Sequence, residues 1–589
     1  MKAEVFQIGE NDMAVKTVIR DFTGDRWLRC DRPCQVIRAD CLDDVLPALE
    51  QVETLVSQQQ WHAVGFISYE ASPAFDSVLQ TQPSRNFPLL YFALFDAIET
   101  VQLPERSEER YHLTNWKPDI SLEDYRSAIA RIKTQIACGE TYQVNFTFRL
   151  RSHFQGSAWP LFLDLVQAQS TPYCAYFETD EFAICSASPE LFFRKLGDRV
   201  ELRPMKGTAA RGRTLAEDAA NRGWLQRSPK DRAENLMIVD MIRNDIGRIA
   251  ELGTVKVPQM FEVEQYPSIH QMTSTVTAMA RTSLTDTMRA LFPCASITGA
   301  PKARTMEAIA ALETSPRKLY TGCLGLIRPD GAAQFNVAIR TVVVDKAAGE
   351  AEYGVGSGVV WDSTSDREYA ECVEKSRVLT YRLPEFSLLE TLLWQPPAGY
   401  FLLAEHLFRL ERSARYFQIP LAIADVECEL EKIAVQLSPQ PHKVRILVDR
   451  KGSIGHTFAA IVAPEMPAAI RLKLADRPID SSNLFLFHKT SHREVYESAL
   501  AAHPDGDDVV LWNERNQVTE ACWGNLAIEL DGEWFTPPVE CGLLAGTFRQ
   551  HLLQRGKLHE RAIAVEELRA CDRIIWMNSV RQWQEGILV

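Results

Sequence analysis

The sequence lacks the cysteine spacing of a disulfide framework or of a zinc site. Its 13 cysteines are odd in number and include no CxxC pair, so we expect reduced thiols. No apolar run approaches the roughly 20 residues that span a bilayer. The opening residues are interrupted by Glu10, Asn11 and Asp12, unlike a signal peptide. These absences predict a cytoplasmic protein without a membrane span.

An excess of basic residues is also missing. The net charge of -14 argues against a broad nucleic-acid surface, although a few Lys and Arg still suffice for small anionic substrates. The length of 589 residues exceeds one ordinary core and predicts two or more domains. With 46% hydrophobic and 24% charged residues, the composition is that of a globular protein.

Strand-like and helical patterns alternate along the chain. Runs at 182–187, 332–344 and 443–448 are typical of strands, and the stretches 232–246 and 302–313 carry helical stripes of apolar residues. This mixture predicts an α/β and α+β chain.

A boundary is expected where a long helical pattern ends at Pro384 and a strand-like segment follows. We therefore predict domains at 1–383 and 386–589. Within the first, residues 1–110 are interpreted as scaffold, and the chemical motifs lie in 111–383.

An acidic helix is predicted near the end of the first domain. Glu368, Glu371 and Glu374 repeat every third position and Lys375 follows Glu371 by four, so they share one helical side. The glycines at 354–358 precede them and leave the backbone bare. This arrangement suits a ligand carboxylate bridged by Mg²⁺, although a solvated charged helix has the same pattern.

Four further residues point to chemistry in combination rather than alone. Asp231 and Glu234 precede an apolar helical stripe, which places them at the edge of a buried region. Lys206 stands beside a glycine in a loop; it is either solvated or, if buried, a nucleophile. Glu190 follows a Ser-Pro turn and is placed to act as a general acid.

Six ordered motifs in residues 111–380 closely resemble the chorismate-utilising family, which includes anthranilate synthase component I and aminodeoxychorismate synthase component I. The motifs are GETYQVN (139–145), SASPE (186–190), PMKGT (204–208), DRAENLMIVDMIRNDIGR (231–248), SITGAPKARTMEAI (296–309) and GSGVVWDSTSDREYAECVEK (356–375).

The resemblance implies a large chorismate-binding α/β sandwich that encloses a deep site. It makes Glu234 and Glu371 the Mg²⁺ ligands. It assigns to the substrate carboxylates Tyr320, Arg340, Gly358 and Lys375. It assigns to the pocket wall His270 and Ser296.

Lys206 separates the branches of this family. Anthranilate synthases have alanine at this place, whereas aminodeoxychorismate synthases use a lysine that adds covalently to chorismate, with Glu190 assisting departure of the hydroxyl. Ammonia then attacks, and the family normally receives it from a separate glutamine amidotransferase subunit. We find no Gly-x-Cys-x-Gly element for such an activity in this chain.

The part after residue 386 carries individually weak signals. Arg409 lies on an amphipathic helical pattern, where a surface charge is the ordinary interpretation. Lys489 follows an alternating run, NLFLFH, which predicts a strand. Glu520 precedes a Trp-Gly-Asn turn, and Gly546-Thr547 opens a helical stretch suited to phosphate.

In this order the signals resemble the class IV pyridoxal-phosphate enzymes, which include aminotransferases and aminodeoxychorismate lyase. The resemblance makes Lys489 the cofactor-binding lysine and Glu520 the partner of the pyridine nitrogen. It assigns the phosphate to Arg409, Thr547 and Phe548, with Ser579 a further candidate. His492 departs from the Asn of related sequences. A homodimer through this domain is left open.

The motifs alone do not separate a lyase from an aminotransferase. The fusion favours the lyase, because the first domain would supply its substrate and the two would make 4-aminobenzoate for folate. The alternative is an anthranilate-type synthase fused to an amino-acid aminotransferase, which Lys206 disfavours. A scaffold protein with inactive domains is disfavoured because every proposed polar role is filled.

Overall fold

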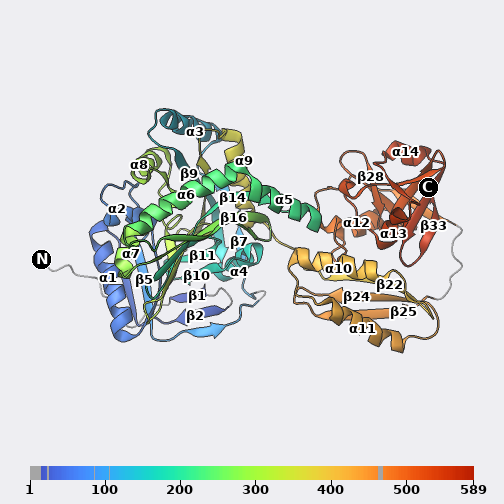
Figure 1. The fold of residues 1–589 in the computed structure, drawn as a ribbon, viewed down its shortest axis with the longest axis horizontal. Helices are drawn as coiled ribbons and strands as arrows, with labels where there is room; N and C mark the ends of the chain where they lie inside the picture. Colours follow the sequence, from blue (N-terminus) through green and yellow to red (C-terminus); the bar gives the residue numbers. More distant parts are fainter. Residues whose placement is uncertain (1–14, 23–25, 85, 105–106, 462–468) are drawn as a thin grey trace. The chain divides into compact units, whose positions relative to one another are not determined.

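The computed structural model describes residues 15–22, 26–84, 86–104, 107–461 and 469–589. It divides into two compact units, the first comprising Met1–Ala210 and Arg222–Leu383, the second Arg211–Asn221 and Pro384–Val589. The division at 221/222 falls inside the helix α5 (Leu215–Arg227) (Figure 1). Among the described residues, no helix is both long and apolar enough to cross a membrane.

The first unit is a sandwich of two antiparallel sheets with helices outside each. Its 11-stranded sheet has the order β17 (Gly299–Ala300), β9 (Gln143–Gly156), β21 (Glu350–Val359), β20 (Thr341–Asp345), β11 (Phe182–Ser188), β10 (Tyr173–Glu178), β1 (Lys16–Arg20), β2 (Trp27–Asp31) and β6 (Glu99–Val101), while β7 (Tyr111–Leu113) and β8 (Lys117–Pro118) pair with β9. Its 10-stranded sheet has the order β14 (Met205–Ala210), β16 (Ile269–Met279), β13 (Arg199–Arg203), β12 (Leu191–Leu196), β19 (Ala333–Val337), β18 (Cys323–Ile327), β4 (His62–Ile67), β5 (Leu90–Phe95) and β3 (Gln35–Ala39), while β15 (Lys256–Gln265) pairs with β16.

Three apolar clusters hold these layers together. Phe66 of β4 and Phe177 of β10 belong to the cluster between the sheets, and two larger clusters bury the helices against the outer faces. The remaining helices of this unit are α1 (Leu42–Gln59), α2 (Ser72–Phe75), α3 (Leu122–Ala137), α4 (Ala158–Gln169), α6 (Pro229–Gly247), α7 (Leu284–Leu291), α8 (Lys302–Leu312) and α9 (Ser365–Ser376). The sandwich predicted for this part of the chain is confirmed.

Local sequence explains the elements that carry the expected site. The helix α6 begins where Ser228 accepts a hydrogen bond from the Asp231 backbone, with Pro229 in its first turn. Its buried face, including Ile238 and Ile242, packs in the cluster beside β14 and β16. The run expected as one strand at 332–344 is instead divided into β19 and β20, because Arg340 takes a left-handed backbone angle of φ 50°.

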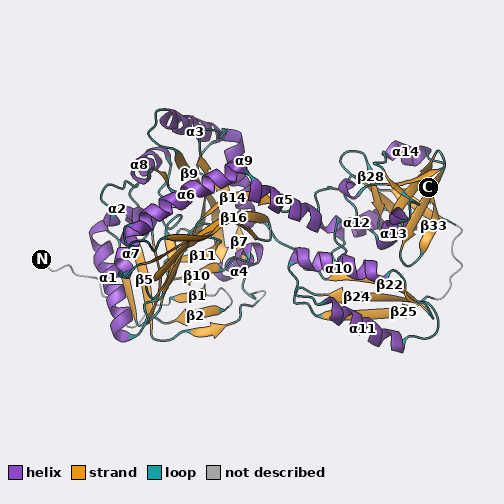
Figure 2. Ribbon diagram, viewed as in Figure 1, coloured by secondary structure: helices purple, strands orange, loops and turns teal. Residues whose placement is uncertain are grey.

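The second unit combines a small and a larger sheet. The 4-stranded sheet has the order β23 (Gly399–Tyr400), β22 (Leu388–Gln395), β24 (His442–Val448) and β25 (Ile454–Ala460). The 8-stranded sheet has the order β28 (Val518–Ala521), β27 (Asp508–Trp512), β26 (Ile470–Leu474), β33 (Gln582–Leu588), β32 (Arg573–Asn578), β29 (Asn525–Leu530), β30 (Glu533–Thr536) and β31 (His559–Glu560). Its helices are α10 (Leu403–Phe417), α11 (Ile423–Gln436), α12 (Glu494–Ala502), α13 (Thr547–Gln554) and α14 (Val565–Ala570) (Figure 2).

The strand predicted immediately before Lys489 is wrong. Residues Leu484–Leu486 form a single 3-10 turn, which begins where the Asn483 side chain accepts from the Phe485 backbone. An alternating apolar run of six residues is too short to distinguish the two conformations, and the capping asparagine decides for the turn.

Candidate active sites

A cavity of about 480 Å³ in the first unit gathers most of the residues expected there. This size suits a small ligand. Its wall is built from β14, β21, α6 and α9, and the predicted residues that it contains are Glu190, Lys206, Glu234, Ser296, Tyr320, Arg340, Gly358, Glu371 and Lys375. His270 is fully buried on β16 but lies outside this wall, which includes its neighbours Ile269 and Gln271. Alternate residues of a strand face opposite sides, so His270 faces away.

Lys206 lies on β14 and reaches the glycine-rich end of β21. A Cβ atom added at Gly358 would come within 3.4 Å of the Lys206 amine, so the missing side chain leaves space at that amine. Burial lowers the pKa of Lys206, and the neighbouring Lys375 lowers it further, against the opposing effect of nearby carboxylates. The amine is thereby shifted toward its uncharged, nucleophilic form.

Glu190 is buried, with only 2% of its surface exposed. Burial raises its pKa to about 7, although the hydroxyl of Ser296 and the charge of Lys206 act in the opposite direction. The Ser296 hydroxyl donates to Glu190 Oε1 at 2.6 Å and fixes that carboxyl group. A carboxyl group that titrates near neutrality is suited to act as an acid and a base in turn.

Lys375 and Tyr320 in the cavity wall are held by contacts with neighbouring residues. The Lys375 amine donates to the Gly356 carbonyl at 2.9 Å and pairs with Glu371 at 2.7 Å. Burial lowers the pKa of Lys375, but Glu371 outweighs it and leaves the pKa raised. The ring of Tyr320 packs against Gly354, where a Cβ atom would come within 2.1 Å.

Two carboxylates face this cavity from different helices. Burial raises the pKa of Glu234, and the like charge of Glu371 adds to that rise. Burial also acts to raise the pKa of Glu371, but Lys375 holds it below its ordinary value. Within the described residues, no group of three or more His, Cys, Asp or Glu side chains is arranged around a metal position. The pair fits a hard cation that takes most of its ligands from water and substrate.

Gln143, which the sequence reasoning passed over, lies near Gly358 and the Lys206 amine. It is 1% exposed, and its amide nitrogen lies 2.4 Å from the position of a Cβ atom at Gly358. Neither polar atom of its side chain has a hydrogen-bond partner in the described part of the chain. A buried unpaired amide is costly unless a ligand meets it. Its place inside the GETYQVN motif was the available signal.

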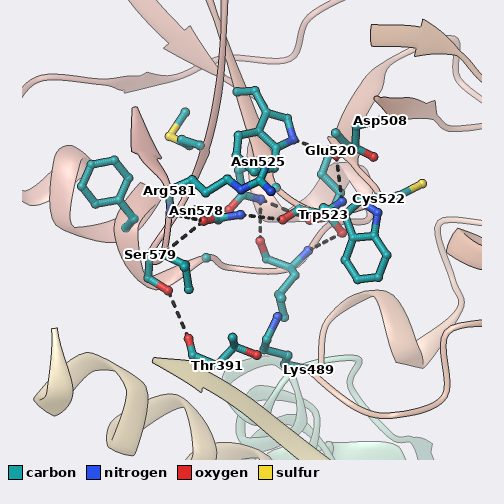
Figure 3. A pocket seen from close by; sticks show the side chains of 18 of the residues that line it. Thr391, Lys489, Asp508, Glu520, Cys522, Trp523, Asn525, Asn578, Ser579 and Arg581 are labelled. Atoms are coloured by element: carbon teal, nitrogen blue, oxygen red, sulfur yellow. Dashed lines mark hydrogen bonds between the residues drawn. The ribbon is translucent and has the colours of Figure 1, made fainter. Parts of the chain in front are cut away.

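A second cavity, also of about 480 Å³, lies in the second unit. Figure 3 shows Lys489 and Thr391 across it from Glu520, Trp523 and Asn578. All the residues predicted for a cofactor line this cavity: Arg409, Lys489, Glu520, Thr547, Phe548 and Ser579. His492 does not, and it lies against the Phe485 ring at 4.5 Å.

Lys489 is fixed to the small sheet by its backbone, since its carbonyl accepts from the Leu389 backbone at 2.9 Å. Burial lowers the pKa of its amine to about 8, and Arg409 contributes to the same shift. An uncharged fraction of amine is therefore present near neutral pH, as a lysine that forms a carbon–nitrogen bond requires.

Glu520 on β28 accepts three hydrogen bonds. The donors are the Tyr496 hydroxyl at 2.8 Å, the Leu544 backbone at 3.1 Å and the Asn525 amide at 3.2 Å. Burial raises its pKa to about 7, while the Leu544 and Tyr496 donors oppose that rise. The donors favour the charged carboxylate, which is the form that pairs with a protonated ring nitrogen.

Arg409 is held by a buried carboxylate that the sequence reasoning did not single out. Two guanidinium nitrogens of Arg409 donate to Glu390 at 2.8 and 2.6 Å, and His406 contacts the same carboxylate at 2.6 Å. Burial alone would raise the pKa of Glu390, but Arg409 and His406 lower it to about 2. The guanidinium thus stands beside the first turn of α13, where the backbone of Thr547 is available to an anion.

Comparison with known proteins matches each of the two regions to a family. Residues 16–381 match the chorismate binding enzymes, and residues 387–585 match amino-transferase class IV. Aminodeoxychorismate synthase component 1 of Bacillus subtilis (strain 168) is 33% identical over 357 residues, which cover 54% of this chain and 76% of that protein. The Klebsiella aerogenes protein of the same name is 40% identical over 270 residues, or 46% of this chain, and the match spans 59% of its length.

A solved structure shares the fold of the first unit. Anthranilate synthase component I from Streptococcus pneumoniae TIGR4 has a TM-score of 0.50 and 22% identity, and the match covers 65% of this chain and 95% of that one. At this identity the likeness concerns the fold alone. The motifs, the cavity and the extent of the family match lead to one conclusion: the chain belongs to the chorismate-binding enzymes and carries an amino-transferase class IV domain after that region.

Proposed function

We propose that the chain makes 4-aminobenzoate from chorismate in two steps, one in each unit. The observation that carries the proposal is the pairing of Lys206, whose pKa burial lowers, with Glu190, whose pKa burial raises, in one cavity. An uncharged amine and a protonated carboxyl group are the states that the first step needs. The name of the curated relatives, aminodeoxychorismate synthase component 1, supports the first of the two steps.

In the first step the amine of Lys206 bonds to C2 of chorismate. The ring double bonds shift, the C4–O bond breaks, and the hydroxyl takes the proton of Glu190 and leaves as water. Glu190 recovers a proton from the nitrogen of the adduct. Ammonia then bonds to C4 and passes one proton to the departing Lys206, which yields 4-amino-4-deoxychorismate and the free amine. Tyr320, Arg340 and Lys375 bind the substrate carboxylates.

A magnesium ion is proposed between Glu234 and Glu371. Both carboxylates line the same cavity from different helices. Burial raises the pKa of Glu234, and a bound cation would favour its charged form. A bound Mg²⁺ would supply positive charge for a substrate carboxylate. The ammonia is proposed to come from a separate glutamine amidotransferase.

The second cavity fits pyridoxal phosphate. Its donor set offers an amine at Lys489, a carboxylate at Glu520 and, beside Arg409, the first turn of α13, whose N-terminus has no side-chain cap in the described structure. Arg409, Thr547, Phe548 and Ser579 would bind the phosphate, and Glu520 would pair with the ring nitrogen. When bound, this cofactor takes up the electron pair left at the substrate carbon.

The residues of the second unit are proposed to complete the aromatic ring. Lys489 takes the proton from C4 of 4-amino-4-deoxychorismate. The C3–O bond breaks, the three-carbon group departs as the enolate of pyruvate, and the proton returns to it. The ring carbons are left as 4-aminobenzoate.

Product analysis of the purified chain tests this proposal. The chain is incubated with chorismate, Mg²⁺, an ammonium salt and pyridoxal phosphate, and the products are separated by chromatography. We expect 4-aminobenzoate and pyruvate in equal amounts. Anthranilate as the aromatic product would refute the proposal, and so would accumulation of 4-amino-4-deoxychorismate without pyruvate, which would exclude the second step.

A further inference from the structure

A short segment of the chorismate-binding match belongs structurally to the second unit. Residues Arg211–Asn221 group with Pro384–Val589, although the family match of residues 16–381 contains them. We refer to Arg211–Asn221 as the docked segment. The residue ranges of the two family matches therefore differ from the residue ranges of the two structural units.

The start of the docked segment is a tight loop closed by Asp218. This buried carboxylate accepts from Arg211 Nε at 2.6 Å and from the Gly212 backbone at 3.0 Å. Arg213 pairs with Glu217 at 2.8 Å in the same turn. A Cβ atom at Gly212 would come within 2.2 Å of the Asp218 backbone nitrogen. Only glycine fits this position without moving the loop.

The loop contacts α10 through a tyrosine. The Tyr416 hydroxyl donates to the Gly212 carbonyl at 2.7 Å, and Arg211 donates back to the Tyr416 carbonyl at 3.1 Å. The Arg211 guanidinium also lies over the Tyr416 ring at 4.5 Å.

A second set of contacts lies next to the catalytic lysine. The Arg213 guanidinium lies 4.7 Å from the centre of the Phe487 ring and donates to the Ser481 carbonyl at 3.3 Å. His488 Nε2 lies 3.1 Å from the Arg213 carbonyl. His488 immediately precedes Lys489 in the sequence.

The neutral form of His488 defines the direction of this contact. His488 is 5% exposed, and burial lowers its pKa to about 4, so the ring is uncharged near neutral pH. A carbonyl only accepts, so Nε2 carries the proton and donates to Arg213, and Nδ1 accepts from the Ser413 hydroxyl at 3.0 Å. The docked segment therefore supplies the acceptor for a buried donor that would otherwise lie unpaired.

We propose that the docked segment is a positioning element for Lys489: it holds His488 in place and thereby sets the direction of the lysine side chain. Lys489 is then fixed from both sides, by His488 before it and by the backbone hydrogen bond from Leu389. This inference rests on the proposed cofactor, because the lysine is positioned for pyridoxal phosphate.

Replacing Gly212 by Ala in the full-length chain tests the inference. Gly212→Ala forces the loop apart and should weaken pyridoxal phosphate binding by about tenfold or more, because a buried donor loses its acceptor. Gly223→Ala is the matched control, since its Cβ meets only the flexible end of Arg227 at 3.3 Å. Binding is followed by the visible absorbance of the lysine-bound cofactor, and the pH at which that absorbance titrates should shift in Gly212→Ala alone. Equal affinity and equal titration in the two variants would overturn the inference.

A pair of substitutions at His488 isolates the hydrogen bond. His488→Gln retains a donor that reaches the Arg213 carbonyl, whereas His488→Ala removes it. Binding should be weakened in His488→Ala and largely restored in His488→Gln; equal loss in both contradicts a role through this bond. This pair also decides the matter if Gly212→Ala fails to fold. Native protein that binds no pyridoxal phosphate would refute the proposed cofactor, whereas native binding with unaffected variants refutes only the role of the docked segment.

Discussion

The lowered pKa of Lys489 has a measurable consequence for cofactor capture. An ordinary lysine has a pKa of 10.5, and burial brings that of Lys489 to about 8. Near pH 7.5, about a quarter of Lys489 is then uncharged, against roughly 0.1% of an ordinary lysine. In the proposed reaction with pyridoxal phosphate, the uncharged amine is the form that attacks the aldehyde, so burial raises the reactive fraction by roughly 200-fold.

The assay mixes cofactor-free chain with pyridoxal phosphate over a range of pH and follows the growth of visible absorbance. The capture rate should rise with pH, because deprotonation frees the amine, and should level off above about 8. Lys443→Ala is a suitable control, since Lys443 lines the same cavity but has no proposed part in capture. A rate that keeps rising toward pH 10.5 would show that burial does not control this lysine, and capture in Lys489→Ala would show that another amine reacts.

The remaining predictions concern both steps. Lys206→Ala should prevent a substrate adduct that mass spectrometry detects in the native chain during turnover, and no native adduct under any condition contradicts covalent catalysis. Glu371→Gln should weaken Mg²⁺ at least by the roughly tenfold typical of outer-shell changes; an unchanged magnesium titration removes Glu371 from the ligands. The chain alone should use ammonium salts and not glutamine, and glutamine-dependent turnover by pure protein contradicts this. Lys489→Ala should abolish pyruvate release while chorismate consumption continues, so that 4-amino-4-deoxychorismate accumulates; native-rate release contradicts the lyase assignment.

The sequence was most informative where ordered motifs carried the inference. The sandwich of the first unit was predicted in this way, and Lys206, Glu190 and Glu371 do meet in one cavity. Motifs define which residues the family shares, and a family shares its fold. Periodicity alone did less well, since NLFLFH forms a 3-10 turn and Arg340 interrupts an apparently continuous strand.

Contacts between distant segments were beyond the sequence. Glu390 looks like any strand residue until the fold places it against Arg409, and Gln143 gains meaning only from the nearness of Gly358. The family resemblance assigns His270 to the pocket wall, but the strand that carries it turns its side chain away from that wall. Such relations depend on three-dimensional register, which no local pattern specifies.

Because of the docked segment, the two units of this chain are not simply two consecutive stretches of sequence. The backbone passes between the units at 210/211, 221/222 and 383/384, so no contiguous stretch of sequence encodes the second unit. A gene divided at 383/384 would leave its downstream product without the acceptor for His488. The region that matches the chorismate-binding enzymes therefore contributes a backbone segment to the second unit. A second unit encoded by a separate gene would need other residues to supply the acceptor of His488.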